Sequence, residues 1–91
     1  MRESELKFNN PTEILANKLE ELEKSLAPYS EGIPTVKTII TYLRLGKLGN
    51  AKAVCSYDAD KIAYYPDIVN FLRQELFAGG TDPEMPPHFR I

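Results

Sequence analysis

Residues 42–66, YLRLGKLGNAKAVCSYDADKIAYYP, decide the fold of this 91-residue chain. The stretch begins in an apolar helical stripe, is interrupted by Gly46 and Gly49, and becomes apolar again before Pro66. Glycine readily adopts the left-handed backbone that commonly ends a helix, and proline is favoured at the first position of the next one. The pattern therefore predicts a helical hairpin that turns at residues 46–49 and is followed by another helix from Pro66.

The N-terminal half of the chain predicts two more helices. Pro11 suits a first helical position, and Pro34 marks the start of the second helix in the same way. Apolar residues recur at helical spacing in both: Leu15, Leu19, Leu22 and Leu26 in the first, and Val36, Ile39, Ile40 and Leu43 in the second. The leucine stripe is expected to cover the core of its own domain, with a homodimer seam as the alternative.

The stretch after the turn leaves two interpretations open. Asp58 falls on the apolar face of a helix over 50–64, where a carboxylate is unfavourable. We expect this helix, with a bend at 56–60 where polar side chains compete for the backbone. The alternative is a short strand at 53–57, which would make the fold α+β.

The sequence as a whole predicts an all-α domain, a small array of about four helices with helical-hairpin packing. The expected helices span residues 11–27, 35–45, 50–64 and 66–77. Together they form one domain over 10–78, preceded by a loose arm at 1–9. Three prolines in the last stretch, TDPEMPPHFRI, prevent a helix, so an extended or disordered tail is expected at 79–91.

The composition is that of an ordinary globular domain, with 43% hydrophobic and 26% charged residues and a net charge of −2. No run approaches the ~18 apolar residues of a membrane span. The first residues, MRESELKFNN, lack the apolar core of a secretory signal. With Cys55 as the only cysteine, no internal disulfide forms. A cytoplasmic location without membrane contact is expected, and the dispersed basic residues disfavour nucleic acid.

The hairpin stretch also carries a family resemblance. Leu43 to Ala51 read L-x-x-G-x-x-x-x-A, and Pro66 follows 20 residues after Gly46. Residues 35–68 resemble one unit of the tetratricopeptide and pentatricopeptide repeats, in which Gly, Ala and Pro serve the turn, the close helix contact and the next helix start. The resemblance implies hairpin packing. Since such repeats stack in about three copies and no second copy is present in the sequence, it assigns no groove residues.

No catalytic or metal-binding constellation is present in the sequence. The thiol of Cys55 lies on the predicted apolar face, and the only histidine, His88, is in the tail, so we expect a buried hydrophobe rather than a nucleophile. Asp58, Asp60 and Asp67 lack the glycine and the bidentate glutamate of a calcium loop. The chain is therefore expected to have no enzymatic activity, cofactor or metal.

The sequence favours a protein–protein interaction or self-association module with an unidentified protein partner. Tyrosine is enriched at interfaces because it offers a large ring and a polar tip. The expected interaction residues are Tyr57, Tyr64 and Tyr65, with Met85, Phe89 and Ile91 of the tail. The alternative is a nucleic-acid-associated regulator that uses the basic residues near the turn, namely Lys37, Arg44, Lys47 and Lys52.

Overall fold

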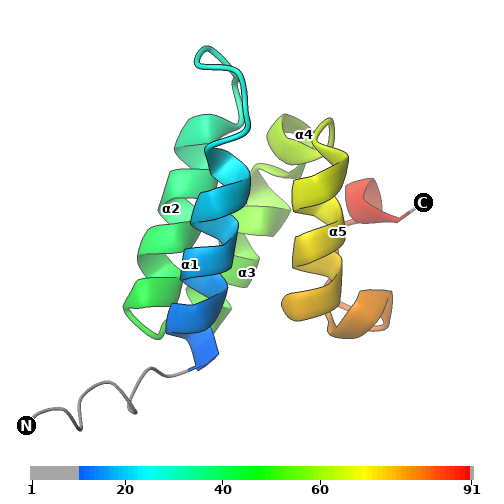
Figure 1. Cartoon of the computed structure of the whole chain (residues 1–91). Coiled ribbons are helices and arrows are strands. Elements are labelled where there is room, and N and C mark those ends of the chain that lie inside the picture. The colour runs from blue at the N-terminus through cyan, green and yellow to red at the C-terminus, as the bar shows by residue number, and fades with distance from the viewer. Residues whose placement is uncertain (1–10, 91) are drawn as a thin grey trace, which may run out of the picture.

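Antiparallel helices form the frame of the computed structural model, which describes residues 11–90 (Figure 1). Along the chain these are α1 (Pro11–Glu23), α2 (Ile33–Arg44), α3 (Leu48–Tyr57), α4 (Ala59–Ile62) and α5 (Pro66–Glu75). Two 3₁₀ turns follow, η2 (Ala78–Gly80) and η3 (Pro87–Phe89). The predicted all-α class is confirmed. The expected arm at 1–9 and Ile91 lie outside the described residues.

The α2–α3 hairpin turns where the glycines predict it. Gly46 has a φ of 75°, the left-handed conformation that suits a residue without Cβ. Its N–H donates to the carbonyl of Leu43 at 3.0 Å, and the N–H of Lys47 donates to the carbonyl of Tyr42 at 2.8 Å. This pair of bonds is the Schellman arrangement that ends α2. Ala51 is fully buried just beyond the turn, as expected for a close helix contact.

The ambiguity around Asp58 is resolved by a break in the helix. α3 ends at Tyr57 and α4 begins at Ala59, while Asp58 between them has φ −113° and ψ 26°. The break leaves the Asp58 carboxylate half-buried at the edge of the core, where it accepts a hydrogen bond from Thr35 Oγ1 at 3.3 Å. The expected bend is confirmed, and the strand alternative at 53–57 is wrong because these residues are helical.

The core lies between the α1–α2 pair and the later helices. Leu19 is fully buried, and the other leucines of its stripe pack against the core from partly exposed positions. The stripe therefore covers the chain's own core, and a homodimer seam on it gains no support. The largest fully buried side chains are Phe77, Phe89, Leu19, Ile39, Leu43, Ile62, Ile68, Leu72, Val36 and Cys55.

The C-terminal segment, residues 79–90, corrects the expectation of an extended or disordered tail. Phe89 is fully buried and its ring meets that of Phe77 edge to face, with centroids 5.9 Å apart and an interplanar angle of 79°. Met85 is also buried, and η3 packs against α4 and α5. The prolines do prevent an α-helix, but they allow 3₁₀ turns that bring two large apolar side chains back to the core.

Replacing Phe89 with alanine should lower the free energy of unfolding by about 3–5 kcal/mol, because a fully buried ring leaves a cavity. Urea denaturation followed by circular dichroism measures the change. His88→Ala is the matched control, since this exposed neighbour should change stability by no more than about 0.5 kcal/mol. Equal stability of the Phe89→Ala variant and the wild type would contradict the packed tail.

Candidate functional site

Three segments meet at one end of the domain, and the first of them is distant in the sequence from the other two. They are the α1–α2 connection (24–32), the α3–α4 junction (57–59) and the α4–α5 connection (63–65). Figure 1 shows the loop after α1 and the turns around α4 at the same end, at the top of the view. The hydrogen bond from Thr35, in the first turn of α2, to Asp58 ties the junction to this end.

Gly32 and Tyr65 hold two of these segments together. The backbone N–H of Gly32 donates to the Tyr65 hydroxyl oxygen at 3.4 Å. A Cβ on residue 32 would lie 2.5 Å from Cε2 of Tyr65 and 3.0 Å from the carbonyl oxygen of Lys61, so glycine is the residue that fits. Tyr65 is half-buried, and this contact engages its ring and its hydroxyl group in the fold. Tyr65 was grouped with the interaction residues by residue type, and its contact with Gly32, 33 positions away, could not be predicted from the sequence.

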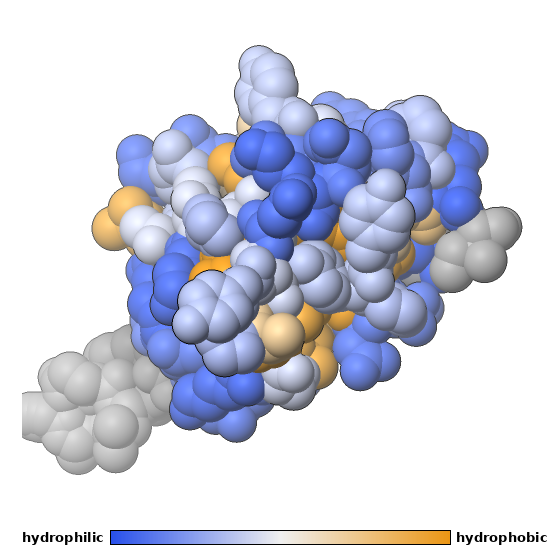
Figure 2. All heavy atoms as spheres, turned by 90° about the horizontal axis from the view of Figure 1, so that it is seen from above, coloured by the Kyte–Doolittle hydropathy of each residue, from blue (hydrophilic) through white to orange (hydrophobic). Residues whose placement is uncertain are grey.

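Three other tyrosines at this end are exposed to solvent. The exposed fractions are 97% for Tyr29, 84% for Tyr57 and 80% for Tyr64. We call this set the tyrosine end. Figure 2 looks down on it and shows pale side chains projecting beside charged ones, with patches of apolar surface between them. Tyr57 and Tyr64 were predicted from the sequence, whereas Tyr29, which follows Pro28 in the α1–α2 connection, was not among the predicted site residues.

An apolar hollow opens at the same end of the domain, between α1 and α5. Its volume is ≈ 160 Å³. Aliphatic and ring carbons form most of the lining, and two polar residues complete it. The lining residues are Leu22, Ser25 and Leu26 from the end of α1 and the segment after it, and Tyr65, Pro66, Asp67 and Ile68 from the start of α5. The predicted leucine stripe thus ends in this hollow.

A larger hollow of ≈ 360 Å³ lies beside α3, lined by Gly49, Lys52, Ala53, Ser56 and Glu84. The Lys52 ammonium that lines it is already engaged. Its Nζ lies 2.7 Å from Asp82 Oδ2 and 5.8 Å from the centre of the Phe77 ring. The hydrogen bond from Lys52 lowers the pKa of Asp82 below its ordinary value of 3.8. This pair ties the C-terminal segment to α3.

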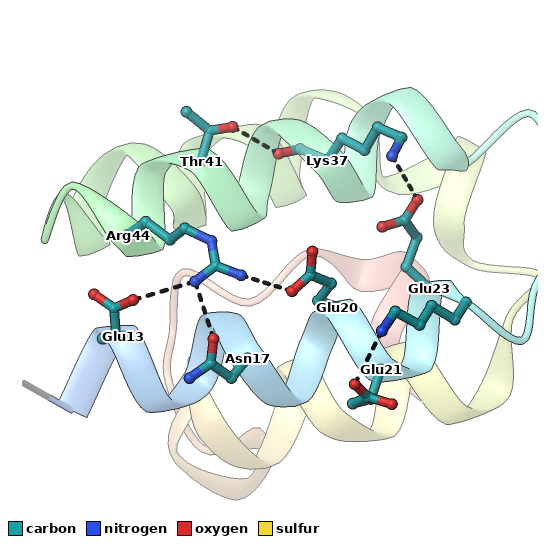
Figure 3. Close-up of polar contacts among 9 residues, drawn as sticks. Glu13, Asn17, Glu20, Glu21, Glu23, Lys37, Thr41 and Arg44 are labelled. Carbon is teal, nitrogen blue, oxygen red and sulfur yellow. Dashed lines mark hydrogen bonds and ion pairs between the residues drawn. The ribbon is translucent and has the colours of Figure 1, made fainter. Parts of the chain in front are cut away.

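Ion pairs also engage the basic residues of the α1–α2 face (Figure 3). Arg44 lies 2.7 Å from Glu20 and 3.2 Å from Glu13, and it donates a further hydrogen bond to Asn17 at 2.9 Å. These three partners recur along one face of α1, so a single guanidinium spans much of that helix. Lys37 lies 3.0 Å from Glu23, toward the other end of the antiparallel pair.

The four basic residues considered for nucleic acid therefore do not form an unneutralised patch. Lys37, Arg44 and Lys52 each lie within ion-pair distance of a carboxylate. Within the described chain, Lys47 makes no ion pair. Phosphate binding depends on cations that are available to replace released counterions. The nucleic-acid hypothesis stays a prediction, and these pairs give it no support.

Cys55 is a core residue. Its side chain is fully buried, and this burial raises the pKa of the thiol to about 12. The thiol is therefore neutral at physiological pH, and a neutral thiol is a poor nucleophile. Residues 11–90 contain no group of three or more potential metal ligands. Over the same range, no helix combines the length and apolar character needed to cross a bilayer.

The tail residues predicted to contact a partner are placed differently. Met85 is 4% exposed and Phe89 is fully buried, so neither presents an apolar surface outside the domain. η3 packs against α4 and α5, and the Phe89 ring meets that of Phe77, so the tail buries apolar area in the chain's own core. Ile91 lies outside the described residues.

Comparison of the chain with protein-family models, curated proteins and solved structures gave no significant match. The resemblance to tetratricopeptide and pentatricopeptide repeats therefore remains limited to the positions of the turn glycine, the small residue and the proline, namely Gly46, Ala51 and Pro66.

Substituting Gly32 with alanine should lower the free energy of unfolding by about 1–3 kcal/mol, because the added methyl group overlaps the Tyr65 ring. The matched control is Gly49→Ala in the first turn of α3, where an added Cβ would meet nothing within 4 Å and φ is not positive. That control should be neutral or should raise stability by about 0.4–1 kcal/mol. Thermal and urea unfolding of the two variants provide the comparison. If Gly32→Ala is as stable as Gly49→Ala, the close approach is refuted.

Proposed function

We propose that the chain is a non-catalytic protein-interaction module that binds a partner protein through the tyrosine end. The observation that carries this proposal is the exposure of Tyr29, Tyr57 and Tyr64, each at least 80%, at a single end of a domain whose other described aromatic side chains are wholly or partly buried. A tyrosine ring brings a large apolar area and a hydroxyl group to an interface, at a low cost in side-chain entropy. Such rings are frequent among the residues that dominate binding energy.

The arrangement of the segments supports the proposal. Tyr29 and Tyr64 come from the α1–α2 and α4–α5 connections, Tyr57 ends α3, and the Gly32–Tyr65 contact holds the two connections in place. The rings therefore stand on a framework that is ordered before binding, which reduces the entropy lost on association. The adjacent hollow between α1 and α5 supplies a concave apolar surface beside the projecting rings.

Two exposed leucines at the other end of the domain provide a control position for binding experiments. Leu45 and Leu48 are 62% and 38% exposed and flank the α2–α3 turn, at the opposite end of the α1–α2 pair (Figure 1). Single exposed aliphatic residues are ordinary on globular proteins.

A reducing compartment such as the cytoplasm suits a chain whose one cysteine is a buried thiol, so we propose a cytoplasmic partner.

Tyr57→Ala and Tyr64→Ala should each abolish or strongly weaken partner binding while changing the free energy of unfolding by no more than about 0.5 kcal/mol, because both rings are exposed. The photo-crosslinking residue p-benzoylphenylalanine, placed at position 57, 64 or 45 of the full chain in its native cells, measures the contact directly. Positions 57 and 64 should crosslink to the same protein, and position 45 should not.

Loss of that crosslink at position 57 when Tyr64 is alanine would show that the two rings serve one interface. Equal crosslinking from positions 45 and 57 would contradict the proposal, as would no crosslinked product from either tyrosine position.

A further inference from the structure

We infer that the partner segment received at the tyrosine end is cationic and inserts one apolar side chain into the hollow between α1 and α5. This inference rests on the proposed function and adds the chemistry of the partner. Two independent observations support it, namely the lining of the hollow and the excess of carboxylates in the segments that meet at this end of the domain.

The hollow has the size and lining for a single apolar group. Cavities of about 150 Å³ with aliphatic walls hold a benzene-sized group, and the hollow measures ≈ 160 Å³. Leu22 and Leu26 form one wall, and Pro66 and Ile68 belong to the other. A branched aliphatic or aromatic side chain would fill it and remove apolar surface on both molecules from water. A single anchor in a pocket is a common centre of a protein interface.

The charges of the segments at this end of the domain favour cationic residues beside that anchor. Segments 24–32 and 57–67 contain four carboxylates (Glu31, Asp58, Asp60 and Asp67) and two lysines, a net charge of −2. One of the lysines, Lys24, already lies 3.3 Å from Glu21. An acidic segment would be repelled here, whereas lysine or arginine side chains are attracted.

Asp67 connects the apolar and the charged features. It lies in the first turn of α5, lines the hollow and is exposed. A cationic residue next to the anchor would therefore meet a carboxylate at the edge of the hollow. The exposed Tyr64 ring is only three positions away in the sequence, and an arginine over its face would gain a cation–π contact. The geometry thus favours arginine or lysine directly beside the apolar anchor.

The test uses a phage-displayed library of random twelve-residue peptides, selected on the full chain. Peptides enriched on the wild type but not on the Tyr57→Ala/Tyr64→Ala double variant should contain a large apolar residue flanked by arginine or lysine. A synthetic copy of the leading peptide should bind Asp67→Asn about tenfold more weakly than the wild type, the effect of one lost charge contact. The control Glu84→Gln, an exposed carboxylate beside the other hollow, should leave binding unchanged.

The Asp67 carboxylate also stabilises α5, because it lies in the first turn of this helix. Asp60→Asn, which lies outside α5, therefore serves as a second variant and should also weaken binding. Peptides that require Tyr57 and Tyr64 but lack cationic residues would overturn this inference and leave the proposed function standing. This inference would also be overturned, again without affecting the proposed function, if the peptides bound the two aspartate variants and the wild-type chain with equal affinity. Peptides that bind the tyrosine double variant equally well, or no enrichment at all, would overturn the proposed function as well.

Discussion

The close approach of Gly32 to Tyr65 joins the two halves of this domain. Its residues are 33 positions apart, and the space between them excludes even a methyl group. On one side lies the antiparallel α1–α2 pair, in which Arg44 and Lys37 of α2 form ion pairs with carboxylates of α1. On the other lie α4 and α5. The contact sets where the α1–α2 connection stands relative to the start of α5, and therefore sets the shape of the hollow between them.

The side chains that stabilise the fold differ from those proposed to bind a partner. The buried rings of Phe77 and Phe89 close the core where the C-terminal segment returns, and the Lys52–Asp82 pair ties that segment to α3. The tyrosine end contributes little to this packing, because its three rings are largely in solvent. A small domain gains most of its stability from a modest apolar core, so these exposed rings are available for the proposed binding.

Local sequence patterns predicted the local features. Gly46 ends α2 because no other residue type adopts its backbone conformation as easily, and Asp58 breaks the next helix because its carboxylate would otherwise enter the core. The missed features depend on contacts between distant positions. The burial of Phe89 requires Phe77, and the role of Tyr65 requires Gly32, so neither follows from spacing along the chain. For the same reason residue type alone suggested Tyr57 and Tyr64 as candidates, whereas the hollow between α1 and α5 could not be predicted.

The proposed binding surface is tested most directly by hydroxyl-radical footprinting of the full chain, compared between purified protein and native cell extract. We expect Tyr29, Tyr57 and Tyr64 to react readily in the purified protein, in keeping with their exposed fractions of at least 80%, and to become protected in the extract. Leu45, at the opposite end, should react equally in both. Unchanged reactivity of the three tyrosines, or protection confined to Leu45, would contradict binding at the tyrosine end.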